Sequence, residues 1–458
     1  MPTGYNQDDS VIARASRYIA EARFSRLPPE VVQKAKHHIL DTLAAMVSGS
    51  KLKPGTLAIK YARSLGGTRE AQVVGSKVVT TAVNAALANG ILAHADETDD
   101  SHAPSGTHPG CGIVPAALAM AERESRDGAA FLTGVVVGYD IGCRITQALG
   151  GPALLQAHNR STHGIGVNFG AAAAAANLAG LDAGRVGYVL SYAAQQASGV
   201  TSWARDQEHT EKAFDFGGMG ARNGVTAATM VQAGFTGVSN VFEGERNFVD
   251  AFSSEPDLEK LAKDLGSYYE ISVASIKKYP VGFPIQAALD ALLIIMRREG
   301  VAAKDVERLV ARLPDSGART VDSREMPDIN IQHVLSMALI DGGVTFASAH
   351  SYERMSDPAV LDMKSRVELV ADEVLSKAMP PRQAIIEITT KDGRLLREHV
   401  VAIRGTPDNP TSTHEVEAKA RDLLLPVLGP QRTETLIHAI AGLERIGNAR
   451  ELRPLLSA

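Results

Sequence analysis

The chain of 458 residues has little cysteine: only Cys111 and Cys143 occur in it. Two thiols cannot supply the three or four ligands of an iron–sulfur cluster or of a structural zinc site. They also give no disulfide framework, so the cysteine content favours a reducing compartment.

An excess of positive charge is also missing, because 47 Lys and Arg face 52 Asp and Glu, for a net charge of −5. No block of Lys and Arg resembles a basic arm, so we expect no nucleic-acid partner. An acidic substrate would need a locally positive site.

Long hydrophobic runs are absent as well. The N-terminus, MPTGYNQDDSVIARAS, has acids where a signal peptide needs bases and shows no apolar core. The most apolar stretch, 164–180, consists of small residues, includes six consecutive alanines and carries Asn168 and Asn177. Alanine transfer is too weak to drive membrane insertion. We therefore expect no membrane span and a cytoplasmic protein.

What the chain does have, at 45% hydrophobic and 22% charged residues, is the composition of a folded globular protein. From residue 10 to about 266, apolar residues recur at helical spacing. One helix is expected after Pro28-Pro29, ending at Gly49. Alanine and glycine dominate the contact faces, which predicts closely packed helices. The further helices are expected at 80–95, 112–124, 128–149, 168–179, 183–197 and 219–233.

The residue pattern of the sequence changes near residue 268. Short β-favouring runs follow at 270–280, 306–314, 366–374 and 383–403, the last interrupted by Lys391-Asp392-Gly393. Helical patterns return at 413–429 and 433–446. We predict a helical domain over 1–267, a small α+β domain over 268–408, and C-terminal helices over 409–458 that pack back on the first domain.

The densest ionisable cluster follows the helix expected at 80–95. An imidazole beside a carboxylate suits general acid–base catalysis near neutral pH. Two other interpretations stay open: a solvated acidic helix end with capping histidines, and a metal site, although the spacing matches no known ligand rule. The members are His94, Asp96, Glu97, Asp99, Asp100, His102 and His108.

Three further segments carry positive charge. Lys212 precedes a glycine-rich turn that opens a helix, where backbone N–H groups could bind a carboxylate or phosphate. The alternative is packing glycines beside a surface lysine. Lys277 and Lys278 lie at the start of the α+β region, facing either a cleft or water. Arg324, in a polar loop, could clamp a carboxylate through its guanidinium fork.

In this order and spacing, the four segments resemble the MmgE/PrpD family, which includes 2-methylcitrate dehydratase, cis-aconitate decarboxylase and iminodisuccinate epimerase. The resemblance runs from the helix after Leu27 through Gly234-Phe-Thr-Gly237 and Phe242-Glu-Gly244 to Asp341-Gly342. It implies a mainly α fold with a large all-helical domain, a smaller α+β lid domain and an active site in the cleft between them. It also implies a homodimer and neither metal nor organic cofactor.

Carried over by position, the family's acidic segment looks like Glu97-Thr98-Asp99-Asp100, and its Thr-His-Pro looks like Thr107-His108-Pro109. Its active-site lysine looks like Lys212, its hinge lysine like Lys277 and its lid arginine like Arg324.

Several positions depart from the family pattern. The family's His-Pro-Thr reads Ser161-Thr162-His163-Gly164, so its histidine is displaced or lost. The histidine three residues after the lysine is Asp215, and those near the hinge are Gly282 and Gln286. The tyrosine that decarboxylase relatives use before the lid arginine has no counterpart.

We predict a cofactor-independent lyase that moves a proton at the carbon next to a carboxylate of a small di- or tricarboxylate. His108 would be the general acid or base, oriented by Asp99 or Asp100, with His102 or His163 as a second proton carrier. Lys212, Lys277 and Arg324 would stabilise developing charge. The remaining substrate-binding candidates are Glu97, Ser161 and Asp215.

Dehydration ranks first because the decarboxylase tyrosine lacks a counterpart, followed by epimerisation or isomerisation and then decarboxylation. Two alternatives belong to other classes: a metal-dependent hydrolase built on the cluster at 94–108, and a non-catalytic helical scaffold. The scaffold is favoured only if the clustered acids and histidines face bulk solvent.

Overall fold

The computed structural model describes residues 9–458 and divides them into two compact units. Unit 1 contains the described residues through Ala274 together with Leu423–Ala458, and unit 2 is Ser275–Asp422. The boundaries expected from the sequence were residues 267 and 408. The second boundary observed lies inside helix α20 (Thr413–Leu428), where no loop or composition change marks it.

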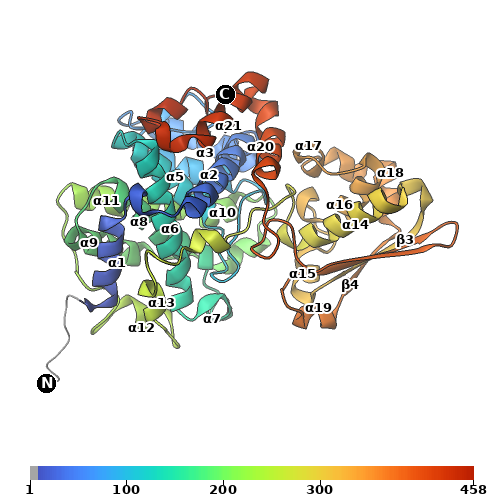
Figure 1. Ribbon diagram of the computed structural model, residues 1–458, viewed down its shortest axis with the longest axis horizontal. Helices are drawn as coiled ribbons and strands as arrows, with labels where there is room; N and C mark the ends of the chain where they lie inside the picture. The colour runs from blue at the N-terminus through green and yellow to red at the C-terminus, as the bar shows by residue number, and fades with distance from the viewer. Residues whose placement is uncertain (1–8) are drawn as a thin grey trace. The chain divides into compact units, whose positions relative to one another are not determined.

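Unit 1 is mainly helical (Figure 1). The helices expected from apolar periodicity are confirmed to within a few residues, except that α8 begins six residues earlier than 168. One antiparallel pair of short strands, β1 (Ala71–Gln72) and β2 (Val79–Thr80), departs from the all-helical expectation. The helices are α1 (Val11–Glu21), α2 (Pro29–Gly49), α3 (Lys53–Leu65), α4 (Ala82–Ala93), α5 (Gly110–Arg123), α6 (Gly128–Ala148), α7 (Gly151–Ala157), α8 (Thr162–Leu178), α9 (Ala183–Gln196), α10 (Thr210–Ala213), α11 (Met219–Gln232), α12 (Phe248–Phe252), α13 (Glu259–Ala262) and α21 (Pro430–Ala441).

Helix α8 is at the centre of unit 1 and packs against α5, α6 and α11. Its start is capped by Ser161, whose hydroxyl accepts the Gly164 N–H at 3.1 Å. A Cβ on Gly142 of α6 would lie 2.7 Å from the Gly166 carbonyl oxygen of α8, so glycine is needed for this close crossing. The small residues expected to allow tight packing therefore have that function.

Helix α6 is, within the described residues, the one helix long and apolar enough to cross a membrane. Of its most apolar window, 89% is buried inside the protein, as in the core helix of a globular unit. The alanine-rich α8 is buried in the same core.

Unit 2 contains a mixed four-stranded sheet in the order β4–β3–β5–β6. Its strands are β3 (Val306–Leu313), β4 (Val367–Ala371), β5 (Ala384–Thr390) and β6 (Leu395–Val400), which confirms the last three β-favouring runs. β3 pairs in parallel with β4 and antiparallel with β5, and β5 pairs antiparallel with β6. The longer helices α14 (Gln286–Glu299) and α16 (Ile331–Asp341) pack against this sheet (Figure 1). The short helices are α15 (Asp315–Val321), α17 (Phe346–Ala349), α18 (Pro358–Lys364) and α19 (Glu373–Lys377).

The strand expected at 270–280 is wrong. This segment forms a 3₁₀ turn at Glu270–Val273 and then an irregular loop. The buried side chain of Gln286 replaces a neighbouring strand: it accepts the Tyr279 N–H at 3.1 Å and donates to the carbonyls of Tyr279 and Val281, each at 2.9 Å. Since these backbone groups are satisfied locally, the β-favouring residues need no sheet partner.

Candidate active site

The acidic segment that follows α4 is buried. Residues 94–102 have exposures of 7% or less, and Asp99 and Asp100 are fully buried. A solvated helix end is therefore the wrong interpretation of this cluster. Local hydrogen bonds shape the segment: Asp96 accepts the Thr98 N–H at 3.1 Å, and the His102 N–H donates to the Thr107 carbonyl at 2.8 Å.

Asp99 lies between two histidines. Its Oδ1 lies 3.1 Å from Nδ1 of His108, and its Oδ2 lies 3.0 Å from Nδ1 of His94. A carboxylate beside Nδ1 favours the tautomer with the proton there, so Nε2 carries the lone pair. The His108 side chain is 15% exposed, whereas those of Asp99 and His94 are fully buried. Of the two imidazoles, His108 is therefore the one that a substrate can reach.

Asp100 belongs to a separate network. It accepts hydrogen bonds from Nδ1 of His38 at 2.8 Å, the Tyr139 hydroxyl at 2.6 Å and the Gly110 N–H at 2.9 Å. Complete burial would raise the pKa of Asp100, but the bonds from His38 and Tyr139 outweigh it and hold the pKa below its usual value. This carboxylate ties the loop to α2, α5 and α6, so the geometry selects Asp99 over Asp100 as the partner of His108.

The two candidates for a second proton carrier have different surroundings. His102 is buried, with Nδ1 2.8 Å from the Ser105 hydroxyl and Nε2 3.0 Å from Glu270, which also faces Arg144 at 3.6 Å. These contacts hold the loop against α6 and the segment before unit 2. The contacts of His102 therefore suit a residue that positions the loop.

His163 lies beside His108, with its Nδ1 accepting the His108 backbone N–H at 3.2 Å. Burial, reinforced by His108, His94 and Lys212, lowers the pKa of His163 well below its ordinary value. The ring is therefore neutral near pH 7, with its proton on Nε2. The displaced histidine of the sequence is a hydrogen-bond donor next to the Asp99–His108 pair.

Phe216 organises the aromatic part of the site. Its ring stacks on His163 with centroids 3.5 Å apart and on His94 at 4.2 Å, and it meets His108 and Trp203 edge-on. It lies in η4 (Phe214–Gly218), a single π-helical turn between α10 and α11. Such a turn bulges one residue out of the helix and is frequent at functional sites.

Lys212, from α10, contacts the same ring. Its ammonium lies 5.0 Å from the Phe216 centroid and 5.5 Å from that of Trp203, which is within cation–π range. It also forms an ion pair with buried Glu97. The fold therefore brings Lys212, Glu97 and the Asp99–His108 pair together around Phe216.

Ser161 and Asp215 form a neighbouring pair in which the serine hydroxyl donates to the carboxylate. Burial raises the pKa of Asp215 to about 7, although the Ser161 bond works in the opposite direction. Gly199 packs against this pair, and a Cβ at this position would lie only 2.5 Å from Oδ1 of Asp215. Near neutral pH this group exchanges between acid and carboxylate.

The two cationic candidates of unit 2 differ in exposure. Lys277 is buried, with 1% of its surface exposed. Its neighbour Lys278 donates a hydrogen bond to Asp290 at 2.7 Å. Arg324 is partly exposed, between α15 and the turn Pro327–Ile329, and its carbonyl accepts the Asn330 amide at 2.5 Å.

Four residues join the site without a role assigned from the sequence: His94, His209, Trp203 and Phe216. His209 has a left-handed backbone (φ 60°), and its Nε2 lies 3.9 Å from Oε1 of Glu97. Burial first, then Lys212 and His94, lowers its pKa well below the ordinary value. His94 belonged to the ionisable cluster found in the sequence, and His209 lies three residues before Lys212, which was the available signal.

Two groups of side chains could hold a metal ion: His94 with Asp99 and Cys111, and His94 with Glu97 and His209. In the first group both Asp99 oxygens already face imidazoles, and the Cys111 thiol donates to the His108 carbonyl at 3.0 Å. In the second group Glu97 is paired with the Lys212 ammonium.

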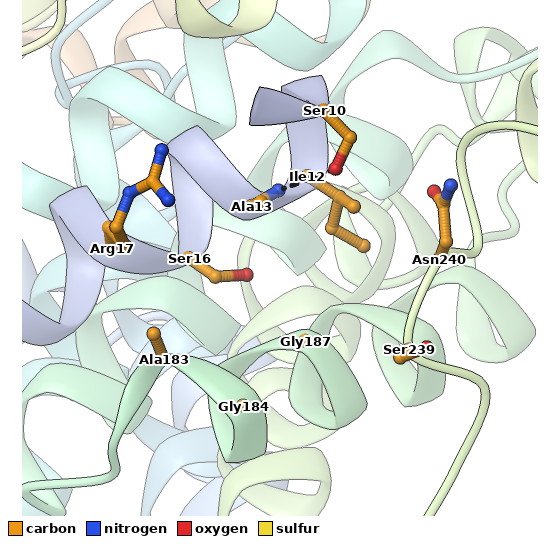
Figure 2. Close-up of a pocket in the computed structure, with 10 residues that line it drawn as sticks. All are labelled: Ser10, Ile12, Ala13, Ser16, Arg17, Ala183, Gly184, Gly187, Ser239 and Asn240. Atoms are coloured by element: carbon orange, nitrogen blue, oxygen red, sulfur yellow. Dashed lines mark hydrogen bonds between the residues drawn. The ribbon is translucent and has the colours of Figure 1, made fainter. Parts of the chain in front are cut away.

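A cavity of about 450 Å³ between α1 and α9 lacks the chemistry of this cluster. Figure 2 shows the Ser16 hydroxyl pointing into it from α1, opposite the small residues of α9. Among the described residues that line it, Arg17 is the one charged side chain, and none is a histidine or a carboxylate that could transfer a proton. The site around Asp99 and His108 is therefore the stronger candidate for catalysis.

Comparison with known proteins identifies the family of the chain. Residues 13–261 match the MmgE/PrpD N-terminal domain, and residues 279–445 match the MmgE/PrpD C-terminal domain. The chain is 25% identical to the cis-aconitate decarboxylase-like protein oryM of Aspergillus oryzae, over 99% of each chain. It is 24% identical to cis-aconitate decarboxylase of Homo sapiens, over 95% of this chain and 92% of that one. The Aspergillus terreus cis-aconitate decarboxylase is 22% identical, over 99% and 97%. Since the two domain matches cover most of its length, the chain belongs to the MmgE/PrpD family of enzymes.

Proposed function

We propose that this protein is a lyase that acts on a small di- or tricarboxylate by proton transfer at the carbon next to a carboxylate, without a cofactor. The observation that carries the proposal is the Asp99–His108 pair, in which a buried carboxylate lies 3.1 Å from Nδ1 of a partly exposed imidazole. This arrangement prepares Nε2 as a general base. The family of the chain and the names of its relatives support a carboxylate substrate.

Removal of the proton places a second negative charge on the substrate's carbon–carboxylate unit. Groups that bind this developing charge should contribute most to catalysis. Lys212 lies against the Phe216 ring that also meets His108, and the neutral His163 offers an Nε2–H donor beside the pair. Glu97 forms an ion pair with the Lys212 ammonium and so fixes its position beside the site.

We also propose roles that rest on the family resemblance. Lys277 and Arg324 bind the remaining substrate carboxylates, with the smaller unit as a lid, and Ser161 and Asp215 contact a polar substrate group. The protein is a cytoplasmic homodimer. Sedimentation of the purified protein tests the dimer.

Dehydration is the first candidate reaction. His108 removes the proton, and the β-hydroxide leaves as water after protonation by a neighbouring group, for which Asp215 is suited because its pKa is about 7. Decarboxylation is the second candidate, favoured by the names of the relatives. There the C–C bond to a carboxylate breaks, carbon dioxide leaves with the electron pair remaining on carbon, and His108 in its protonated form delivers a proton to that carbon. Epimerisation, the return of the proton to the opposite face, is the third outcome.

Proton NMR of the chelator-treated protein in deuterium oxide distinguishes these reactions. The substrates are 2-methylcitrate, citrate, malate-type hydroxy acids, cis-aconitate and iminodisuccinate. A vinyl signal that arises from a saturated hydroxy acid reports dehydration, new product signals that accompany release of carbon dioxide report decarboxylation, and deuterium incorporation without a net change reports epimerisation. If no compound exchanges a proton or reacts, the proposal is wrong.

A further inference from the structure

Two buried imidazole nitrogens face the carboxylate that holds Lys212. His94 and His209 are 0% and 3% exposed, and Nε2 of neither ring has a hydrogen-bond partner within the described residues. Their donor atoms and a Glu97 oxygen all lie within 4.8 Å of one another. Buried nitrogens without a hydrogen bond are costly, so their convergence on one carboxylate calls for an explanation.

The second partner of His94 prepares it as a ligand. Its Nδ1 lies 3.0 Å from Asp99, which places the proton there and leaves the Nε2 lone pair for another group. Histidines that bind metals are usually oriented in this way by a carboxylate. The second imidazole, His209, is 3% exposed, and its Nε2 lies 3.9 Å from Oε1 of Glu97, so it presents a ring nitrogen to the same carboxylate.

We propose that His94, Glu97 and His209 form an inhibitory binding site for a divalent transition-metal ion of the Zn²⁺ type. Two nitrogens and one oxygen suit Zn²⁺ or Co²⁺ better than Mg²⁺ or Ca²⁺, which prefer oxygen ligands. In a tetrahedral site the ligand atoms lie about 3.4 Å apart, so the three side chains must move inward by about 1 Å.

The Lys212 ammonium forms an ion pair with the Glu97 carboxylate, which the metal ion would need as a ligand. A divalent cation on Glu97 and the lysine's positive charge repel each other, so binding of the ion displaces Lys212. That the ion inhibits rests on the proposed function, in which Lys212 stabilises the developing charge. That the ion binds does not depend on it.

The test is titration of the full chain at neutral pH with zinc chloride by calorimetry, and with cobalt chloride by visible absorption. We expect one ion per chain, with the visible spectrum of cobalt bound by nitrogen and oxygen. His209→Ala should weaken binding at least about 10-fold. His209→Gln serves as a second variant of similar size. His158→Ala, which removes an exposed histidine, should leave the affinity unchanged.

Lys212→Met gives the most specific readout. If the ammonium competes for Glu97, its removal should tighten zinc binding at least about 10-fold. The proposal is wrong if the zinc affinity does not rise in Lys212→Met, or if it is unchanged in both His209 variants. It is also wrong if the unmodified chain does not bind zinc stoichiometrically.

The inhibition is measured separately with the substrate found by NMR. Zinc should abolish turnover, and a chelator should restore it. Activation by zinc would overturn the inhibitory assignment. If no substrate is found, the proposed function fails, while the binding measurements still decide whether the metal site exists.

Discussion

At the residue scale, the first prediction concerns His108 and Lys212, one as proton carrier and the other as a fixed positive charge. His108→Gln and Lys212→Met should each lower kcat/KM by at least about 100-fold, because each removes an interaction made in the transition state. The circular dichroism spectrum should not change. Steady-state kinetics with the NMR-identified substrate makes the measurement.

Lys53→Met is the matched control for the lysine, because Lys53 pairs with Glu208 while both side chains are more than half exposed. It should retain normal kinetics. Near-normal kinetics in His108→Gln or Lys212→Met would contradict the assigned role of that residue.

The second prediction separates two adjacent aspartates. Asp99→Asn keeps the side-chain size but removes the charge beside His108, so kcat should fall about 100-fold or more with little change in stability. Asp100→Asn instead disturbs a buried carboxylate that accepts three hydrogen bonds, so the free energy of unfolding should fall by about 2–4 kcal/mol. Urea unfolding and kinetics are measured on both variants. Equal effects of the two substitutions on both quantities would argue against this division.

These aspartates also show what the sequence could predict about the site. Ionisable residue types singled out segments that the structure brings together, with Glu97, Asp99, His108, His163 and Lys212 around Phe216. The roles of Asp99 and Asp100 could not be separated, because neighbouring residues in an irregular loop point to different partners. His38 and Tyr139, which hold Asp100 away from His108, lie far away in sequence.

At the scale of secondary-structure elements, the π-helical turn depends on close contact between backbones. A Cβ on Gly217 would lie 2.2 Å from the Gly90 carbonyl oxygen of α4 and 2.8 Å from that of Cys111 in α5. We predict that Gly217→Ala lowers the free energy of unfolding by about 1–3 kcal/mol or more, because neither backbone can move easily. Activity should fall as well, since the adjacent Phe216 must shift. Chemical denaturation and kinetics test both effects.

Gly184→Ala is the control for this substitution. Gly184 lies in the first turn of α9, and its nearest neighbour is Asp182 Oδ1 at 3.4 Å from the added Cβ. Stability should change by less than about 1 kcal/mol. A Gly217→Ala protein as stable and active as the control would show that the turn tolerates a side chain.

Elements were predictable where one periodicity dominated. Apolar spacing located most of the longer helices of unit 1 and three β runs, because burial of one face requires that spacing, but it did not single out α1 or α3. It failed at 270–280, where the side chain of Gln286 satisfies the backbone. It could not indicate the π-helical turn, since the glycines Gly217 and Gly218 are read from sequence only as a flexible or capped helix start.

At the scale of the whole molecule, the mainly α architecture with a small mixed sheet is confirmed. Composition and periodicity carry that much. The boundary between the two units cannot be predicted from composition or periodicity, because it lies within one continuous helix, α20. Polar contacts in the core of unit 1 between residues far apart in the sequence cannot be predicted in this way either. One of them affects the stability of the whole fold.

Asp140 of α6 is that contact. It is fully buried, accepts a hydrogen bond from Tyr18 of α1, and accepts the Glu270 N–H at 2.7 Å. Burial raises its pKa from 3.8 to about 7, despite opposition from the Tyr18 bond and Arg144. The folded protein therefore retains a proton between about pH 4 and pH 7 that the unfolded chain has lost. This contribution to stability is fully present below the unfolded pKa and is lost as the pH rises through the folded pKa.

Asp140→Asn tests this prediction, because asparagine imitates the neutral acid: its Oδ1 can accept the Glu270 N–H, and its Nδ2–H can donate to the Tyr18 oxygen as a protonated Oδ2 would. As the pH rises from about 5 to about 7, the unmodified protein should lose stability relative to the variant by up to about 1.4 kcal/mol per pH unit, which corresponds to one proton. Urea unfolding at several pH values measures both curves, and subtraction cancels the carboxylates they share. Parallel curves would show that Asp140 is ionised in the folded protein, so that α1 and α6 are joined around a charge.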